Sequence, residues 1–231
     1  MLFKSQVLTQ ASGSVGGLTY SHNRAGMYTR ARSIPTNPQS QYQQASREAL
    51  ATLSQAWSQT LTPTQRAGWA AYAAAVSKTG ILGDPIFITG FNWYVACNAP
   101  RLRQLFARID APPTDFTLTS LTGPTLAAEE GDAFTTLAFD NGDEWATTSG
   151  GYLFISVARA LSQTINFFKG PFRALSFVAG DETPPTSPAT VPTFDSVPVV
   201  PGLKYFVRCI ASAADGRLSV PVIVQAIGTG T

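Results

Sequence analysis

The sequence predicts an α+β protein in which a β-hairpin and a helical region precede a β-sandwich. Helix-start signals and apolar residues at three- and four-residue spacing occur in the first half of the chain. Short β-patterned runs separated by turn residues fill the second half. The paired prolines of APPTDF, residues 111–116, divide the two patterns because they oppose a helix and favour an extended linker. We therefore expect an arm and glycine-rich hairpin over residues 1–36, a helical anchor over residues 37–110 and a sandwich over residues 111–231.

The composition is that of a globular protein with few charges. Of 231 residues, 44% are hydrophobic, enough for a real core, and only 13% are charged, against about 25% in a typical domain. Residues 1–110 hold ten Lys or Arg and three Asp or Glu, a balance of +7, and residues 111–231 hold six and eleven, a balance of −5. Such an asymmetry can mark contact with nucleic acid or a basic anchor on an acidic partner, and ordinary solvated charge is the alternative. Nucleic acid is less favoured, since the basic residues are spread from Lys4 to Arg108 rather than clustered.

No segment predicts secretion or membrane insertion. Residues 1–14 lack the continuous apolar core of a signal peptide, and no run approaches the ~18 apolar residues of a membrane span. We therefore expect synthesis in the cytoplasm and no membrane contact.

Residues 13–38 predict a β-hairpin with glycines that allow close approach. Gly13, Gly16 and Gly17 permit dihedral angles closed to other residues, and the residues around the turn-like segment 23–26 alternate. The alternating residues are Leu18, Tyr20, Tyr28, Arg30 and Arg32. The side chains do not divide cleanly into an apolar and a polar face, and a lone two-stranded ribbon is poorly stable in water. We therefore expect the hairpin to lie either on this chain's own helices or on a neighbouring subunit.

Two helices are predicted after the hairpin. Asn37, with Pro38 at the first helical position, predicts a helix that runs to about Gln59. Its apolar face is expected to contain Tyr42, Ala45, Ala49, Leu50, Leu53, Ala56 and Trp57. Thr62 and Gln65 form a capping box that predicts the start of a second helix. The buried face of that helix is expected to contain Trp69, Tyr72, Ala73 and Val76.

A third helix is predicted over residues 89–98, where TGFNWYVACN is followed by Pro100. A short strand at residues 86–88 precedes it. Arg101 and Arg103 lie just beyond the predicted helix, where they could meet carboxylates of a partner or remain solvated.

The second half predicts six strands separated by turns. The expected strands cover residues 116–121, 133–139, 152–157, 174–178, 204–211 and 218–226. A series of short strands with regular turn signals is typical of a β-sandwich.

No catalytic or cofactor signature is present, so we expect no enzyme activity, no cofactor and no metal. His22 is the only histidine, and there is no phosphate-binding loop, dinucleotide fingerprint or C-x-x-C pair. Cys97 and Cys209 are expected to be buried free thiols. Two acidic clusters could collect a hard cation, but their spacing lacks the alternate ligand positions of an EF-hand, and polar turns are the favoured interpretation. The clusters are Glu129, Glu130 and Asp132, and Asp140, Asp143 and Glu144.

The segment VPGLKYFVRCIASAADGRLSVP, residues 200–221, resembles the last two strands of a fibronectin type III domain. Pro201 and Gly202 match the turn, and Tyr205 matches the tyrosine-corner position, whose hydroxyl bonds to nearby backbone. The resemblance implies that Tyr205, Val207, Cys209 and Ala211 share one face of an immunoglobulin-like or fibronectin III-like sandwich. The chain departs from that family at Trp145, which lies in a DNGDEW turn rather than in a strand.

The N-terminal half resembles virion proteins of tailed phages and prophages. These proteins open with a G-x-x-G-x-x-x-Y hairpin, a basic Y-x-R-x-R strand, and then N-P and a helix with Q-x-x-x-R. The matching residues here are Gly13, Gly16, Tyr20, Tyr28, Arg30, Arg32, Asn37, Pro38, Gln43 and Arg47, followed by the segment LTPTQRAGW. The resemblance implies a virion component and leaves its place in the head, neck or tail open.

These observations favour a non-enzymatic virion structural protein, made in the host cytoplasm and docked through its N-terminal half. Within that class a capsid decoration (cement) protein is the first hypothesis, and a tail, neck or baseplate component is the alternative. The expected partners are other virion proteins, either the major capsid protein or tail and neck proteins, together with further copies of this chain. The residues expected to contact a partner are Arg24, Tyr28, Arg30, Arg32, Arg101 and Arg103.

A carbohydrate-binding or adhesin module is the competing class. In that hypothesis exposed aromatic rings of the sandwich hold a host-surface glycan. The candidate rings are Trp145, Tyr152, Phe167 and Phe168. Rings clustered on the surface among polar residues would support this hypothesis, and buried rings would oppose it.

Overall fold

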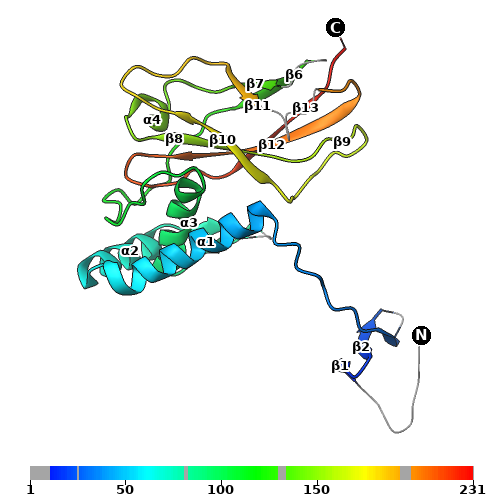
Figure 1. Cartoon of the computed structure of the whole chain (residues 1–231). Coiled ribbons are helices and arrows are strands. Elements are labelled where there is room, and N and C mark those ends of the chain that lie inside the picture. Colours follow the sequence, from blue (N-terminus) through cyan, green and yellow to red (C-terminus); the bar gives the residue numbers. More distant parts are fainter. Residues whose placement is uncertain (1–10, 25, 81–82, 130–133, 193–198, 231) are drawn as a thin grey trace. The chain divides into compact units, whose positions relative to one another are not determined.

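A computed structural model describes residues 11–24, 26–80, 83–129, 134–192 and 199–230. These residues form helices and antiparallel sheets, so the protein is α+β, as predicted (Figure 1). The chain divides into two compact units, Met1–Ser40 and Gln41–Thr231.

The first unit is a three-stranded antiparallel sheet rather than a two-stranded hairpin. The predicted hairpin is present as β2 (Leu18–Asn23) and β3 (Gly26–Ala31), and β1 (Gly13–Val15) pairs with β2 on its other edge. Gly16 has a φ of +56°, a left-handed value that lets the chain reverse between β1 and β2. β1 has only three residues, too few to show the alternation by which a strand is predicted from sequence.

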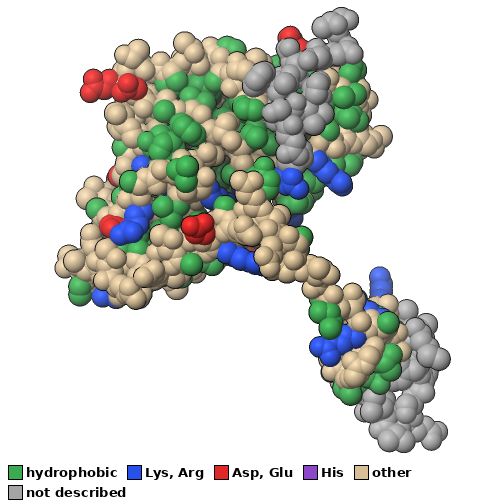
Figure 2. Space-filling model, in the orientation of Figure 1, with side chains coloured by type: hydrophobic (Ala, Val, Ile, Leu, Met, Phe, Trp, Pro, Cys, Tyr) green, Lys and Arg blue, Asp and Glu red, His purple; other side chains and the backbone are tan. Residues whose placement is uncertain are grey.

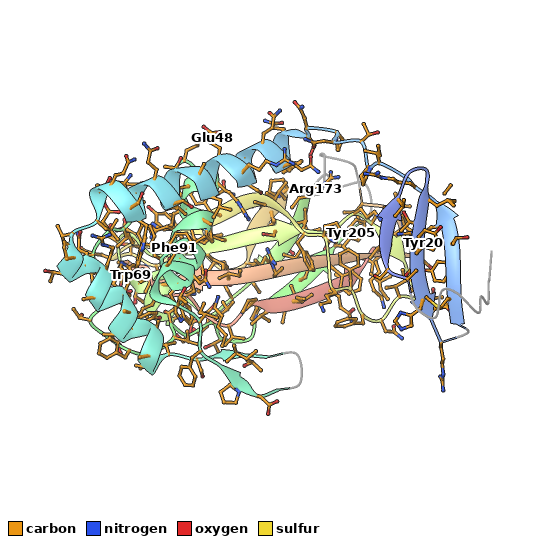
Figure 3. All side chains as sticks on the ribbon, turned by 90° about the horizontal axis from the view of Figure 1, so that it is seen from below. Tyr20, Glu48, Trp69, Phe91, Arg173 and Tyr205 are labelled. Carbon is orange, nitrogen blue, oxygen red and sulfur yellow. The ribbon has the colours of Figure 1, made fainter. Side chains whose placement is uncertain are left out.

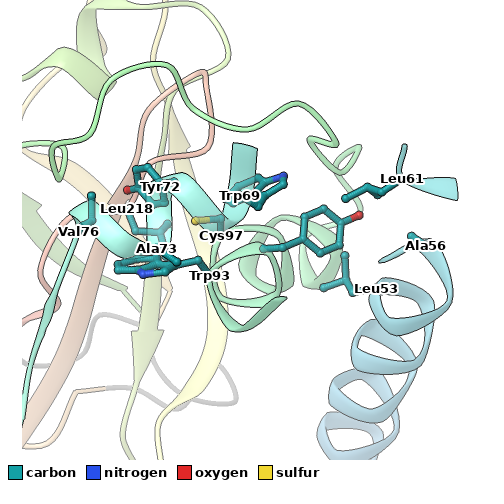
Figure 4. Packing of buried hydrophobic residues seen from close by; sticks show 11 residues of the cluster. Leu53, Ala56, Leu61, Trp69, Tyr72, Ala73, Val76, Trp93, Cys97 and Leu218 are labelled. Atoms are coloured by element: carbon teal, nitrogen blue, oxygen red, sulfur yellow. The ribbon is translucent and has the colours of Figure 1, made fainter. Parts of the chain in front are cut away.

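Three helices open the second unit, and α3 (Gly90–Arg103) packs against both of the others, α1 (Gln41–Gln55) and α2 (Pro63–Ala75). A π-helical turn, η1 (Ala56–Thr60), extends α1. Their shared core is dominated by aromatic side chains that meet edge to face (Figure 4). The cluster contains Leu53, Ala56, Leu61, Trp69, Tyr72, Ala73, Val76, Trp93, Tyr94, Cys97 and Leu218.

The first helix begins three residues later than predicted, at Gln41 rather than at Pro38. Gln39 has a φ of +47°, and its backbone N–H donates to the side chain of Asn37 at 3.2 Å, so the chain turns before it enters α1. The predicted apolar face is also narrower than expected. Ala49 and Leu53 are buried, but Tyr42 and Leu50 are 42% and 50% exposed, because α1 packs on α3 along a single stripe.

The start of the second helix is confirmed, and the end of the third is not where Pro100 predicts it. The Gln65 N–H donates to Thr62 Oγ1 at 3.2 Å, and the Thr62 N–H donates to Gln65 Oε1 at 2.9 Å, a complete capping box. Helix α3 continues through Pro100 to Arg103. Pro100 has no backbone N–H, so the helix loses one hydrogen bond. The last turn of α3 nevertheless forms, because its buried Asn98 and Arg101 side chains are hydrogen-bonded to the segment that follows.

Two antiparallel sheets lie face to face in the rest of the second unit. One has the order β10–β8–β12–β13, with β9 also paired to β12, and the other has the order β11–β7–β6. The strands of the first are β8 (Tyr152–Val157), β9 (Leu161–Ser162), β10 (Arg173–Ala179), β12 (Leu203–Ser212) and β13 (Val222–Ile227). Those of the second are β6 (Thr125–Ala128), β7 (Phe134–Ala138) and β11 (Ala189–Pro192).

The core between the two sheets includes a short helix, α4 (Glu144–Thr147), whose Trp145 is fully buried. Gly180 lies against the carbonyl of Trp145, so closely that a Cβ at that position would overlap it. The remaining core side chains come from facing strands, and they include Leu137, Leu153, Ile155, Val191, Val207 and Cys209.

One strand prediction is wrong, another begins too early, and three strands of this half, β6, β9 and β11, were not predicted. Residues 116–121 form no strand, and β6 begins at Thr125 instead. β11 was not predicted, since its ATVP sequence is short and ends in proline. The last strand begins at Val222 rather than at residue 218, because Pro221 has no N–H for a ladder. The short strand expected at residues 86–88 is β5 (Pro85–Ile86), which pairs with β4 (Lys78–Thr79).

Strand β12 lies between two packing layers. Val207 and Cys209 face the core between the sheets, whereas Ile210 on the opposite face packs against the helical cluster. Phe206, also on that outer face, is covered by Ala158, Leu161 and neighbouring rings. The helices therefore lie along the outer face of the five-stranded sheet, below it in Figure 1.

The segment expected to be a free linker is fixed to the helices. Trp69 Nε1 donates to the carbonyl of Asp110 at 3.1 Å, and Tyr72 Oη donates to that of Thr117 at 3.4 Å. Pro113 is buried, and Pro112 lies against Gly68 of α2. The boundary expected at residue 111 therefore does not separate compact units, because the helices and sheets form one unit from Gln41 onwards.

We expect Thr62→Ala to lower the free energy of unfolding of the second unit by about 1 kcal/mol, because the backbone N–H of Gln65 loses its acceptor, Thr62 Oγ1. Thr64→Ala, an exposed position in the same helical turn, is the matched control and should change it by less than about 0.5 kcal/mol. Urea unfolding followed by far-UV circular dichroism measures both. Equal effects of the two substitutions would contradict a stabilising cap.

Candidate functional site

The pairing register shows that the β1–β3 sheet has one apolar and one polar face, which corrects the expectation of undivided faces. Directly paired residues share a face, and the pairs Val15 with Leu18 and His22 with Met27 place apolar side chains on the same side as Tyr20. This apolar face consists of Val15, Leu18, Tyr20, Met27 and Ala31, with Gly13, His22 and Thr29. We call it the apolar face of the β1–β3 sheet.

The opposite face of the sheet is polar and carries the predicted Tyr28 and Arg30. Tyr28 is paired with Ser21, Arg30 with Thr19, and Thr19 with Ser14. The hydroxyls of Ser14 and Thr19 lie 2.8 Å apart. The sequence alone does not assign side chains to the two faces. The turn near residues 24–27 could have different lengths, and each length gives a different pairing register and so a different face for each side chain.

The apolar face lacks a core of its own. None of the described residues between 11 and 40 is buried, and Val15 and Leu18 are 74% and 46% exposed. Hydrophobic and basic side chains are both visible on the surface of this unit in Figure 2, and Tyr20 is labelled in Figure 3. Val15 and Leu18 therefore leave apolar surface of this sheet exposed to solvent.

The basic residues predicted to contact a partner lie in both units and in different environments. Arg24, Arg30 and Arg32 are exposed in the first unit. The backbone N–H of Arg32 donates to the carbonyl of Gly17 at 2.8 Å, which closes the open end of the hairpin. In the second unit Arg103 is exposed at the end of α3.

Arg101 was predicted to contact a partner, but it is only 7% exposed and has a structural role. Its Nε donates to the carbonyl of Ala107 at 3.2 Å, and its guanidinium lies over the ring of Tyr152 at 4.9 Å. Burial lowers the pKa of Arg101, and a positive charge at the C-terminal end of α3 is favoured by the helix dipole. Arg101 therefore ties α3 to the sheet and is not available to a partner.

The four aromatic rings considered for glycan binding do not form one surface. Trp145 is fully buried against Phe139. Tyr152 stacks on Phe106 at 4.2 Å between ring centroids, and Phe168 packs against Phe172 and Phe206. Only Phe167 of the four is widely exposed, at 76%. Because these rings are dispersed and mostly covered, they do not support the glycan-binding hypothesis that named them.

The titratable groups of the described residues do not assemble into a reactive centre. Cys97 and Cys209 are buried free thiols, as predicted, and burial raises the pKa of each to about 12, so neither is a thiolate at neutral pH. No group of three His, Cys, Asp or Glu side chains that could hold a metal occurs in the described part of the chain. Glu130 and Asp132 of the first acidic cluster lie outside the described residues.

The second acidic cluster is held by hydrogen bonds and ion pairs within the protein. Asp143 accepts hydrogen bonds from the N–H and the hydroxyl of Thr122, both at 2.8 Å. Glu144 pairs with Arg217, whose guanidinium also meets Asp215 at 2.7 Å and Asp115 at 2.9 Å. Burial by itself would lower the pKa of Arg217, but these three carboxylates outweigh it and raise that pKa. The cluster therefore joins α4, the 115–117 segment and the turn before β13.

No protein-family model matches the chain, and no curated protein matches it. Among solved structures the chain is similar to the adhesin domain of Epf from Streptococcus pyogenes, with 10% sequence identity and a TM-score of 0.32. The similarity covers 50% of this chain and 33% of the other, so this chain spans about a third of that structure's length. A TM-score of this size carries no argument about fold or function. Among the described residues, no helix is long and apolar enough to span a bilayer.

We expect Arg217→Met to lower the free energy of unfolding by about 2 kcal/mol, because a side chain that is 8% exposed leaves three carboxylates without their cation. The expected loss of stability is moderate because those carboxylates are 33–51% exposed and would be hydrated in the variant. Arg47→Met, at an exposed position on α1, is the control and should have little effect. Urea midpoints at low ionic strength measure both, and a neutral Arg217→Met would contradict a joining role.

Proposed function

We propose that this chain is a non-enzymatic structural protein of a virion that docks through its β1–β3 sheet and presents its second unit. The observation that carries the proposal is the apolar face of the β1–β3 sheet, which has exposed Val15 and Leu18 and no buried residue among residues 11–40 that the structure describes. Covering one Val or Leu side chain contributes about 1.5–3 kcal/mol. Docking on a partner would therefore order the sheet and bind it in one step.

The partner surface that complements this sheet is acidic as well as apolar. Arg24, Arg30 and Arg32 are exposed on or beside the sheet, and the described acidic residues of the chain all lie beyond Ser40. Because Arg30 lies on the polar face, opposite Val15 and Leu18, the partner must enclose the sheet and contact both faces. Its carboxylates would then meet these guanidinium groups in charge-assisted hydrogen bonds. Arg103 is a further exposed contact residue in the second unit, and Arg101 is not.

The virion assignment rests on the resemblance of the N-terminal half to tailed-phage proteins, which is confined to the sheet and the helices that follow. Within a virion we favour a capsid decoration protein whose partner is the major capsid protein. A sheet of some twenty residues makes a small contact, and repetition of that contact over oligomers on the particle would multiply its strength. A tail, neck or baseplate position is the alternative.

For the second unit we propose an immunoglobulin-like sandwich of fibronectin III type. If β6, β7 and β11 are strands A, B and E, the other sheet has the order C′, C, F and G in β10, β8, β12 and β13. The Val200 N–H donates to Tyr205 Oη at 3.0 Å near the start of strand F, as in a tyrosine corner. Tyr205 is labelled in Figure 3. Trp145 departs from the pattern, because it reaches the core from α4 between strands B and C.

We expect deletion of residues 1–40 to abolish association with particles and to leave the second unit folded, because that unit has its own core. Co-sedimentation with particles of the source that lack the protein measures association, and circular dichroism measures folding. Retained association of the folded truncated chain would contradict docking through the sheet.

In the same assay we expect Arg30→Glu to weaken association at least tenfold and Arg47→Glu, also exposed but outside the sheet, to change it less than twofold. Quantitative mass spectrometry of purified particles then decides the position in the virion. About one copy per capsid subunit is the expected ratio for a decoration protein, and a few copies per particle would move the chain to the tail or neck. Its absence from particles would reject the virion proposal.

A further inference from the structure

A cavity of about 360 Å³ lies between α3, the β4 strand, β12 and the turn that precedes β13. Its walls are mainly apolar and include Trp93, Pro100, Leu118, Ile210 and Leu218. Volumes of this size fall at the lower end of the range of small-molecule sites.

One wall of the cavity carries the ammonium group of Lys78. Its Nζ lies 4.5 Å from the centre of the Trp93 ring, and desolvation by burial lowers the pKa of the lysine. Among the described residues no carboxylate pairs with Lys78 and no acceptor receives a hydrogen bond from it. Cys97, whose thiolate form would raise the pKa of Lys78, is a neutral thiol at pH 7.

The neighbouring polar atom is also a donor without an acceptor. Trp93 is 1% exposed, and its Nε1–H has no hydrogen-bond partner within the described structure. Figure 4 shows the Trp93 ring beneath Tyr72 and Ala73, in the cluster that forms one side of the cavity. The Lys78 ammonium and the Trp93 Nε1–H are thus two neighbouring donors without an acceptor, and an anionic or acceptor group would satisfy them.

We propose that this cavity binds a small amphipathic anion, an aliphatic or aromatic carboxylate whose apolar body fills the space between Trp93 and Leu218. Its carboxylate accepts hydrogen bonds from the ammonium of Lys78. The apolar walls select the body and the single cation selects the charged end, a division of roles usual in ligand pockets. The site lies wholly within the second unit, and it is independent of the proposed docking through the β1–β3 sheet.

The first test uses decanoate as the anionic probe and decanol as its neutral counterpart, with binding to the full chain measured by ligand-observed NMR titration. We expect saturable binding of decanoate, and at least tenfold weaker binding to Lys78→Met, which keeps the apolar stem and loses the charge. Lys169→Met, at an exposed lysine outside the cavity, is the matched control and should bind decanoate like the parent chain. We expect decanol to bind the parent chain at least tenfold more weakly than decanoate.

The second test fills the cavity. Ala96→Leu places three more carbon atoms in the lining of the cavity, and Ala51→Leu makes the same change on an exposed position of α1. We expect Ala96→Leu to abolish decanoate binding and Ala51→Leu to retain it, with circular dichroism to show that both fold. If Ala96→Leu does not fold, the lysine variants alone decide. The proposal is overturned if decanoate does not bind, if Lys78→Met binds it as well as the parent chain, or if decanol binds equally.

Discussion

The architecture of the second unit depends on burying β12 on both of its faces. Val207 and Cys209 need the three-stranded sheet on one side, and Phe206 and Ile210 need cover on the other. A single sheet with one wet face would leave that second set of side chains in water. The helices and the 158–172 segment supply the missing cover, so the helices belong to the same unit as the two sheets rather than to a separate anchor.

Buried polar side chains then fix the segment that connects the helices to the sheets. The amide of Asn98 donates to the carbonyl of Ile109 at 3.0 Å and accepts from its N–H at 2.6 Å, and Tyr94 donates to Asp110 at 2.9 Å. The two Asn98 bonds satisfy the backbone carbonyl and N–H of Ile109. Arg217 continues the same role at Asp115. The segment is therefore held at Ile109, Asp110, Asp115 and Thr117, between the helices and the sheets.

The first unit presents the opposite physical situation. Its strands are paired and its faces are sorted, yet none of the described residues from 11 to 40 is buried. In the second unit apolar surface is covered by the chain itself, whereas Val15 and Leu18 of the first unit are 74% and 46% exposed. The second unit has its own hydrophobic core, and we propose that the first unit is covered only when it docks on a partner.

Local signals in the sequence determined the α+β class, the capping box at Thr62, the hairpin of β2 and β3, and the buried free thiols, because each depends on neighbouring residues or on composition. The tertiary structure decided which arginine is exposed and which is buried, where β1 and β11 pair, and how residues 109–117 are held. The register that sorts the β1–β3 faces, the burial of Trp145 and the cavity beside Lys78 also belong to this second group. All of them arise from contacts between residues distant in the chain, and a single sequence carries no periodic signal for such contacts.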